Sequence, residues 1–213
     1  MNSRTTTELE ILAGRPVDAV VYIWYPCRRF SLGHVSIYVG GVPKCPWPEF
    51  DSLDHSNRAA SPEEDNYVSF FAEPDIPRGH LSCAGTLNTL QADFVDPPHV
   101  KYYLIGLDVE KMRYHAGEIH KGKKYGNFIM SHSYNSINKN CATMVAKILK
   151  AGGVENLLSI IQRIGYGKNI YWTPKDIAQL CNELRNNDKA VKVKGLDCPN
   201  KLDLPFKTLM GFR

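Results

Sequence analysis

The sequence contains no apolar run long enough to cross a lipid bilayer. Its longest run, residues 19–25, has seven residues, whereas a spanning helix needs about 20. The first eight residues also lack the basic-then-apolar pattern of a secretory signal peptide. We therefore expect no integral membrane segment, synthesis in the cytoplasm, and delivery to a target cell or periplasm by a specialised secretion system.

The cysteines show no pairing pattern that indicates a metal centre or a redox motif. Six are spread along the chain, at positions 27, 45, 83, 141, 181 and 198, and no two form a C-x-x-C unit. Two histidines, His115 and His120, are five positions apart, which places them on different faces of a helix. The sequence therefore predicts no metal site and no cofactor.

Charge is distributed unevenly between the two halves of the chain. Residues 1–110 carry 8 Lys and Arg against 15 Asp and Glu, a net charge of −7, whereas residues 111–213 carry 18 against 7, a net charge of +11. The pattern indicates either two solvated faces of opposite sign or a basic surface that meets a polyanion. No nucleic-acid-binding motif is present, and we expect no nucleic-acid partner.

Hydrophobic periodicity predicts an α+β domain over residues 1–190, followed by a basic, mostly irregular tail over residues 191–213. Three of the four predicted helices follow a capping residue, Asp108, Asn140 or Thr173, and the predicted strands come before these three. Strands are expected over 18–25, 34–39, 67–71 and 100–107, and helices over 8–12, 109–120, 142–150 and 174–186. These elements would form a small antiparallel sheet packed against helices.

Cys141 stands at the first turn of the predicted helix 142–150, directly after Asn140, a residue type that caps helices. The exposed N–H groups and the positive end of a helix stabilise an anion, so the pattern predicts a thiol pKa below its ordinary value. The same N–H groups could hold the oxyanion of an acyl-transfer intermediate. A cysteine on such a helix can equally be a buried, inert side chain.

A nucleophilic cysteine needs a base, and His34 is the candidate. It begins a predicted strand directly after Gly33, where a packed core would hold its ring in a fixed position. An ordinary edge histidine would show the same local pattern, so the hypothesis depends on Cys141 and His34 lying within hydrogen-bonding distance.

The motifs around both residues resemble those of the permuted papain-like, or NlpC-like, thiol enzymes, in which the histidine precedes the cysteine. The segment 33–40, Gly-His-Val-Ser-Ile-Tyr-Val-Gly, is similar to their histidine strand, and 140–145, Asn-Cys-Ala-Thr-Met-Val, to their nucleophile helix. Segments 67–71, 106–108 and 172–176 resemble landmarks of the branch of bacterial toxin and effector domains similar to the Rho-inactivation domain. The resemblance covers about residues 20–186 and implies a circularly permuted papain-like fold.

The resemblance also implies an acidic residue between the histidine and the cysteine that orients the imidazole. Asp93 is the best positional match, and Glu73, Asp75 and Asp96 are alternatives. The NlpC-type enzymes instead place a polar residue on the strand after the histidine, a place that Ser69 would fit poorly.

The implied activity is that of a toxin or effector thiol hydrolase, an amidase or peptidase that cleaves amide bonds of peptidoglycan peptides, with an immunity protein as a partner. The alternative is a cysteine-dependent fatty acyltransferase that modifies lysines of target proteins, and the likeness to the toxin branch favours it. A third hypothesis is a binding module that keeps the fold without activity.

Overall fold

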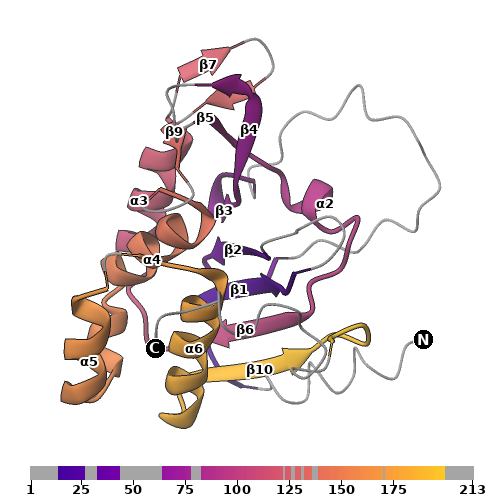
Figure 1. The fold of residues 1–213 in the computed structure, drawn as a ribbon. Helices are drawn as coiled ribbons and strands as arrows, with labels where there is room; N and C mark the ends of the chain where they lie inside the picture. Colours follow the sequence, from indigo (N-terminus) through magenta and orange to yellow (C-terminus); the bar gives the residue numbers. More distant parts are fainter. Residues whose placement is uncertain are drawn as a thin grey trace.

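The structure is a computed structural model that describes residues 14–26, 33–43, 64–77, 83–121, 123–125, 128–130, 132–135, 139–169 and 171–199. It is an α+β fold in which an antiparallel sheet packs against a layer of helices (Figure 1). The predicted helix at residues 8–12 lies outside the described residues. No helix in the described part of the chain is long and apolar enough to cross a membrane.

The central sheet has five strands in the order β10-β6-β1-β2-β3, and all neighbours are antiparallel. Its strands are β1 (Ala19–Trp24), β2 (His34–Val39), β3 (Tyr67–Val68), β6 (Val100–Leu104) and β10 (Ala190–Lys194). Strand β1 lies in the middle, where Val21 pairs with Ile37 of β2 and with Tyr102 of β6. The predicted strand positions of β1 and β2 are confirmed.

Strand β1 is apolar throughout because both faces of the sheet are covered. Val21 and Ile23 pack with the core between the sheet and the helices. Tyr22 and Trp24 point to the opposite face, where an aromatic cluster includes Phe94. The alternation of side chains along β2 follows the same rule, so Val35 and His34 belong to opposite faces.

The predicted strand 67–71 is divided in the structure. Strand β3 ends at Val68, and Ser69 separates it from β4 (Phe70–Pro77), which leaves the central sheet and pairs with β5 (Cys83–Leu87). Strand β5 also pairs with β9 (His132–Tyr134), while β7 (Lys123–Tyr125) and β8 (Phe128–Met130) form a separate two-stranded unit. Ser69 therefore stands where the chain passes from one sheet to the other.

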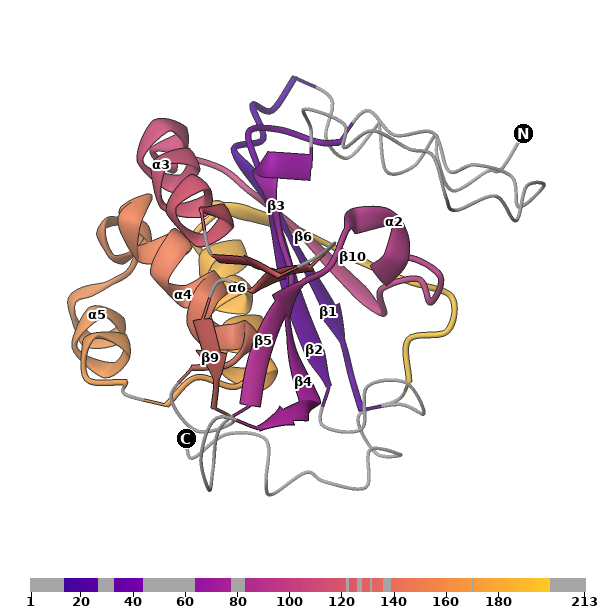
Figure 2. The same cartoon turned by 90° about the horizontal axis from the view of Figure 1, so that it is seen from above.

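Three helices with side-chain N-caps form the layer against the sheet: α3 (Val109–His120), α4 (Cys141–Ala151) and α6 (Pro174–Asn186). Their caps are Asp108, Asn140 and Thr173, and these starts agree with the sequence prediction. The remaining helical elements are short: η1 (Glu64–Asn66), α2 (Leu90–Asp93), η2 (Val154–Leu157) and α5 (Ile160–Gly167). Viewed from above, α3, α4, α5 and α6 lie on one side of the sheet and α2 on the other (Figure 2).

The predicted basic, mostly irregular tail over residues 191–213 begins in a strand. Strand β10 pairs with β6 along its whole length, from Ala190 opposite Leu104 to Lys194 opposite Val100. Valine and lysine alternate along β10, a pattern that suits an edge strand with one face against the protein. The domain therefore includes a strand that the basic composition of the segment concealed.

Candidate active site

His34 is a buried residue at the start of β2, paired across the sheet with Trp24. Gly33 precedes it with a φ of +77°, and a Cβ there would lie 3.0 Å from the Trp24 carbonyl oxygen, so the sharp entry into β2 favours glycine. The imidazole stacks on Phe71, with ring centroids 4.1 Å apart, and also lies 5.4 Å from the Trp24 ring. These contacts fix the plane of the ring.

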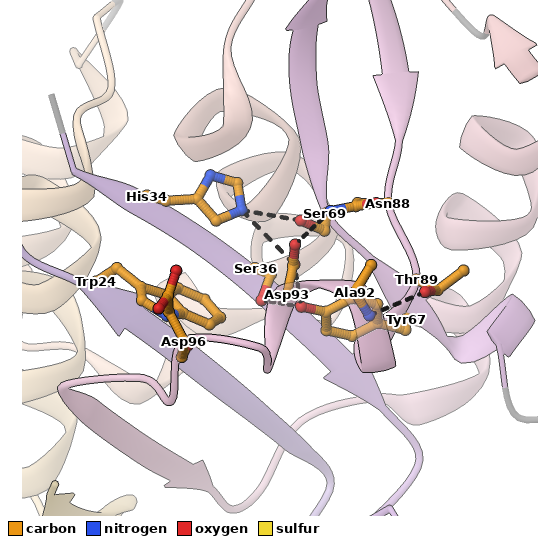
Figure 3. A network of polar contacts seen from close by, with 10 residues as sticks. All are labelled: Trp24, His34, Ser36, Tyr67, Ser69, Asn88, Thr89, Ala92, Asp93 and Asp96. Atoms are coloured by element: carbon orange, nitrogen blue, oxygen red, sulfur yellow. Dashed lines mark hydrogen bonds and ion pairs between the residues drawn. The ribbon is translucent and has the colours of Figure 1, made fainter. Parts of the chain in front are cut away.

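One nitrogen of this ring faces two polar side chains. Nε2 of His34 lies 2.8 Å from Oγ of Ser69 and 3.8 Å from Oδ2 of Asp93 (Figure 3). The sequence does not predict the contact with Ser69, because Ser69 fits poorly to the place that NlpC-type enzymes give a polar residue on the strand after the histidine. It arises because the chain breaks between β3 and β4 at this residue.

Asp93 is fully buried at the end of α2, and its carboxylate is held by two donors. The hydroxyl of Tyr67 donates to Oδ2, and Nδ2 of Asn88 donates to Oδ1 over 2.7 Å (Figure 3). Burial and the neighbouring carboxylate of Asp93 raise the pKa of Tyr67 well above its usual value, so the phenol stays a donor. Hydrogen bonds of this kind compensate for the burial of a charge.

The N-terminus of α4 is fixed to the start of α6 through Asn140. Its Oδ1 accepts from the backbone N–H of Thr143 over 2.9 Å, and its Nδ2 donates to the carbonyl of Trp172 over 3.0 Å. Cys141 follows as the first residue of α4 and is buried. The predicted position of this cysteine in the first turn is confirmed.

The Cys141 sulfur lies against the start of β2. The backbones of Val35, Ala142 and Cys141 itself lie close enough to the thiol to lower its pKa, and the pairing between β2 and β3 ends at Ile37, before Val35 is reached. The first turn of α4 therefore contacts β2 beyond the end of β3. Val35 is the residue directly after His34.

The expected low thiol pKa is not found. Burial raises the pKa of Cys141 to about 11, the backbone hydrogen bonds lower it by less than burial raises it, and the charge of Asp93 adds a further increase. The sequence argument counted the helix N-terminus and omitted desolvation, which disfavours the thiolate in a closed site. With a pKa of about 11, the Cys141 side chain is a thiol at neutral pH.

The structure brings His34 and Asp93 together and places Cys141 beside the next residue of the same strand. The contact between the sulfur and the imidazole stays a prediction. Among the alternatives to Asp93, Asp96 contributes its backbone carbonyl, which accepts from the Trp24 indole over 2.7 Å; the side chains of Glu73 and Asp75 are outside the described set.

Sequence reasoning missed Tyr67 and Asn88, the two donors to Asp93. Tyr67 lies in a segment predicted as a strand and similar to a landmark of the toxin branch, and neither assigns it a partner, since no short motif links a donor to a carboxylate 26 positions away. Within the described ranges, no three His, Cys, Asp or Glu side chains form a group that could hold a metal ion. Of the two histidines considered for a metal, His120 contacts the Tyr67 carbonyl through Nε2 at 2.8 Å.

The fold and the site define an α+β protein with a buried histidine–carboxylate pair and a cysteine at the start of a neighbouring helix. Residues 81–203 match the family described as the IcsB middle domain, and the chain belongs to this family. The matched segment contains Asp93 and Cys141, whereas His34 precedes it. No curated protein and no solved structure matches the chain significantly.

Proposed function

We propose that the protein is a cysteine-dependent acyl-transfer enzyme on a circularly permuted papain-like fold. Cys141 is the nucleophile, His34 the base and Asp93 the residue that orients the base. One observation carries the proposal: the buried imidazole of His34 is held through Nε2 at the start of β2, and both the backbone of the next residue of that strand and the charge of Asp93, the neighbour of His34, act on the Cys141 thiol.

The chemistry follows from the orientation of the ring. With Nε2 held by Ser69 and Asp93, Nδ1 of His34 is the nitrogen that takes the thiol proton. The sulfur attacks the carbonyl carbon of the acyl donor, and the backbone N–H groups at the start of α4 stabilise the oxyanion. The intermediate collapses to a thioester on Cys141 as the imidazolium returns the proton to the leaving group.

Because the resting Cys141 is protonated, the order of proton transfer and nucleophilic attack has to be considered. Because burial holds the pKa of Cys141 at about 11, proton transfer to His34 accompanies the attack instead of preceding it as a standing ion pair. Asp93 stabilises the imidazolium that forms in this step, and Tyr67 and Asn88 keep its carboxylate in place.

The thioester has two fates, and we propose transfer to an amine as the principal one. The match to the IcsB middle domain supports a bacterial secreted effector, and the likeness to the toxin branch favours a fatty acyltransferase that modifies lysines of target proteins. Such an effector would be delivered by a specialised secretion system into its target cell.

Hydrolysis of peptidoglycan peptides is the second candidate. The observation that favours it is the net charge of +11 over residues 111–213, which suits an anionic cell envelope. Here water resolves the acyl-enzyme, and the producing cell needs an immunity protein. The two candidates share every step up to the thioester.

Mass spectrometry of the acylated protein tests the shared step. The purified chain is incubated separately with an alkyne-tagged fatty acyl-CoA and with peptidoglycan. We expect a hydroxylamine-sensitive adduct on Cys141 that is lost in Cys141→Ala and kept in the matched control Cys181→Ala, since Cys181 is buried in the core on α6.

The product released from the thioester distinguishes acyl transfer to lysine from hydrolysis. Tagged lysines in added target-cell protein would identify the transferase, and released peptide fragments would identify the amidase. If neither substrate leaves an adduct on Cys141 and both variants behave alike, the protein is a binding module and the proposal is wrong.

A further inference from the structure

The short helix α5 exposes an unusual amount of apolar surface. Ile160, Ile161 and Ile164 are 74%, 84% and 55% exposed. With 3.6 residues per turn, these three side chains fall within an arc of about 100°. Other exposed apolar side chains, such as Val95 and Tyr114, have no exposed large apolar residue within four positions in the sequence, which is normal for a surface. We call these three residues the isoleucine face.

The isoleucine face points outward because the opposite side of α5 is anchored. Tyr166 lies roughly opposite the isoleucines on the helix and is buried. Its ring stacks on Trp172, with centroids 6.0 Å apart, and its hydroxyl donates to Glu183 over 2.9 Å. Figures 1 and 2 both show α5 at the outer margin of the helical layer, beyond α4 and α6 and away from the sheet.

The N-terminus of α5 is equally well defined. Ser159 and Gln162 form a capping box, and Nε of Arg163 donates to the Glu155 carbonyl over 3.0 Å. The exposure of three isoleucines is therefore a property of a formed, anchored helix and does not result from a frayed segment.

Basic residues outnumber acidic ones in the sequence on either side of this apolar stripe. Residues 139–175 contain six Lys and Arg and a single acidic residue, Glu155. On α5 itself, Arg163 is exposed, and Lys168, the exposed C-cap, lies one turn after Ile164. Tyr171 is exposed shortly beyond the helix, and tyrosine is enriched where membrane and water meet.

We propose that the isoleucine face of α5 is a membrane-docking surface for anionic lipid bilayers. The isoleucines enter the boundary between headgroups and acyl chains, while Arg163 and Lys168 contact acidic headgroups. A helix of eight residues lies in the plane of the interface, so the binding is peripheral and reversible. This role is independent of the chemistry at Cys141.

The basic charge around α5 favours an anionic lipid surface over a second copy of the chain as the partner. A symmetric dimer through the isoleucine face would place the same basic segment on both sides of the contact, and like charges would oppose association. An anionic lipid surface supplies the opposite charge and an apolar layer together.

Vesicle flotation with the full chain tests the proposal. We expect binding to phosphatidylcholine vesicles that contain phosphatidylserine, at least tenfold weaker binding to phosphatidylcholine alone, and weakening with salt. The double variant Ile161→Gln/Ile164→Gln should reduce binding by about tenfold or more. Leu196→Gln is the matched control, because Leu196 is 76% exposed outside α5, and its binding should equal that of the parent.

Insertion is tested separately with Ile164→Trp and Leu196→Trp. A blue shift of the emission on adding anionic vesicles, in the first variant only, supports docking through α5. Equal vesicle binding by parent and double variant at an unchanged melting temperature overturns the proposal. So does concentration-dependent dimerisation that the double variant abolishes, since the occupant would then be a second copy.

Discussion

The pair of His34 and Asp93 is the most specific arrangement in the molecule at the scale of single residues. A buried carboxylate without partners would be costly, yet here a phenol and an amide hold it while its Oδ2 lies 3.8 Å from the imidazole. Tyr67 and Asn88 thus keep a negative charge in place for the moment when His34 becomes positive. The arrangement suits a site that must stabilise a transient imidazolium.

Replacing Asp93 with Asn should slow formation of the Cys141 thioester by roughly two orders of magnitude, because the amide cannot stabilise the imidazolium. Asn has the same size, so the fold should be retained. Asp96→Asn is the matched control, since Asp96 contributes its backbone carbonyl to the Trp24 indole and that group is unchanged. The measurement is the rate of adduct formation across pH, together with the melting temperature. Equal rates in the two variants would remove Asp93 from the mechanism.

Sequence reasoning selected His34, Asp93 and Cys141 from local patterns and a family resemblance. It did not select Ser69, because the contact with His34 depends on the chain leaving one sheet for another at that residue. It also misjudged the thiol pKa, since burial is a property of the whole fold and the capped helix end is a local one. Residue types were readable from the sequence, but their desolvation was not.

At the scale of elements, the helices were predicted best because their ends carry local signals. Asp108, Asn140 and Thr173 each cap a helix whose start the sequence gives closely. Strands β5, β7, β8 and β9 were missed because they are short and gain their pairing from segments distant in sequence. The helix α5 was missed although its start carries a local signal, the capping box of Ser159 and Gln162.

The two capping boxes provide a test of how much each helix contributes to stability. In α6, the Thr173 hydroxyl bonds with the backbone N–H and the carboxylate of Asp176, and the helix buries Ile177 and Leu184 in the core. Thr173→Ala should lower the free energy of unfolding by about 1 to 2 kcal/mol.

The matched variant is Ser159→Ala in the capping box of the peripheral α5. We expect a loss below about 0.5 kcal/mol, because local fraying of α5 does not require the core to open. Urea unfolding followed by circular dichroism measures both values. Comparable losses in the two variants would mean that α5 unfolds together with the core.

At the scale of the whole molecule, the acidic and basic halves of the sequence form different structural elements. The acidic first half supplies most of the central sheet and α2, whereas the basic second half supplies α4, α5, α6 and the edge strand β10. Among the helices the positive charge lies on α4 and α5, since α3 and α6 each carry equal numbers of basic and acidic residues, and α5 is at the outer margin of the helical layer (Figure 2). A basic α5 at the margin and a buried site on the sheet suit an enzyme that binds an anionic surface with one part and performs chemistry with another.

Two cysteines and three tyrosines in or against the core have raised pKa values. Burial raises the pKa of Cys141 to about 11 and raises the pKa values of Cys181, Tyr67, Tyr102 and Tyr134 above their ordinary values. In the unfolded chain these groups ionise near about 8.5 for cysteine and about 10 for tyrosine. Above those values the unfolded chain binds fewer protons than the folded one, so the stability decreases as the pH rises.

The free energy of unfolding should therefore be constant with respect to these groups below about pH 8 and decrease steeply from about pH 9 to about pH 11. Urea unfolding at a series of pH values measures the slope. Cys181→Ala removes one buried thiol from α6 and should reduce the slope by up to about 1.4 kcal/mol per pH unit, whatever its effect at neutral pH. An identical slope in Cys181→Ala and the parent would show that the Cys181 thiol ionises equally in the folded and unfolded chains, contrary to its burial.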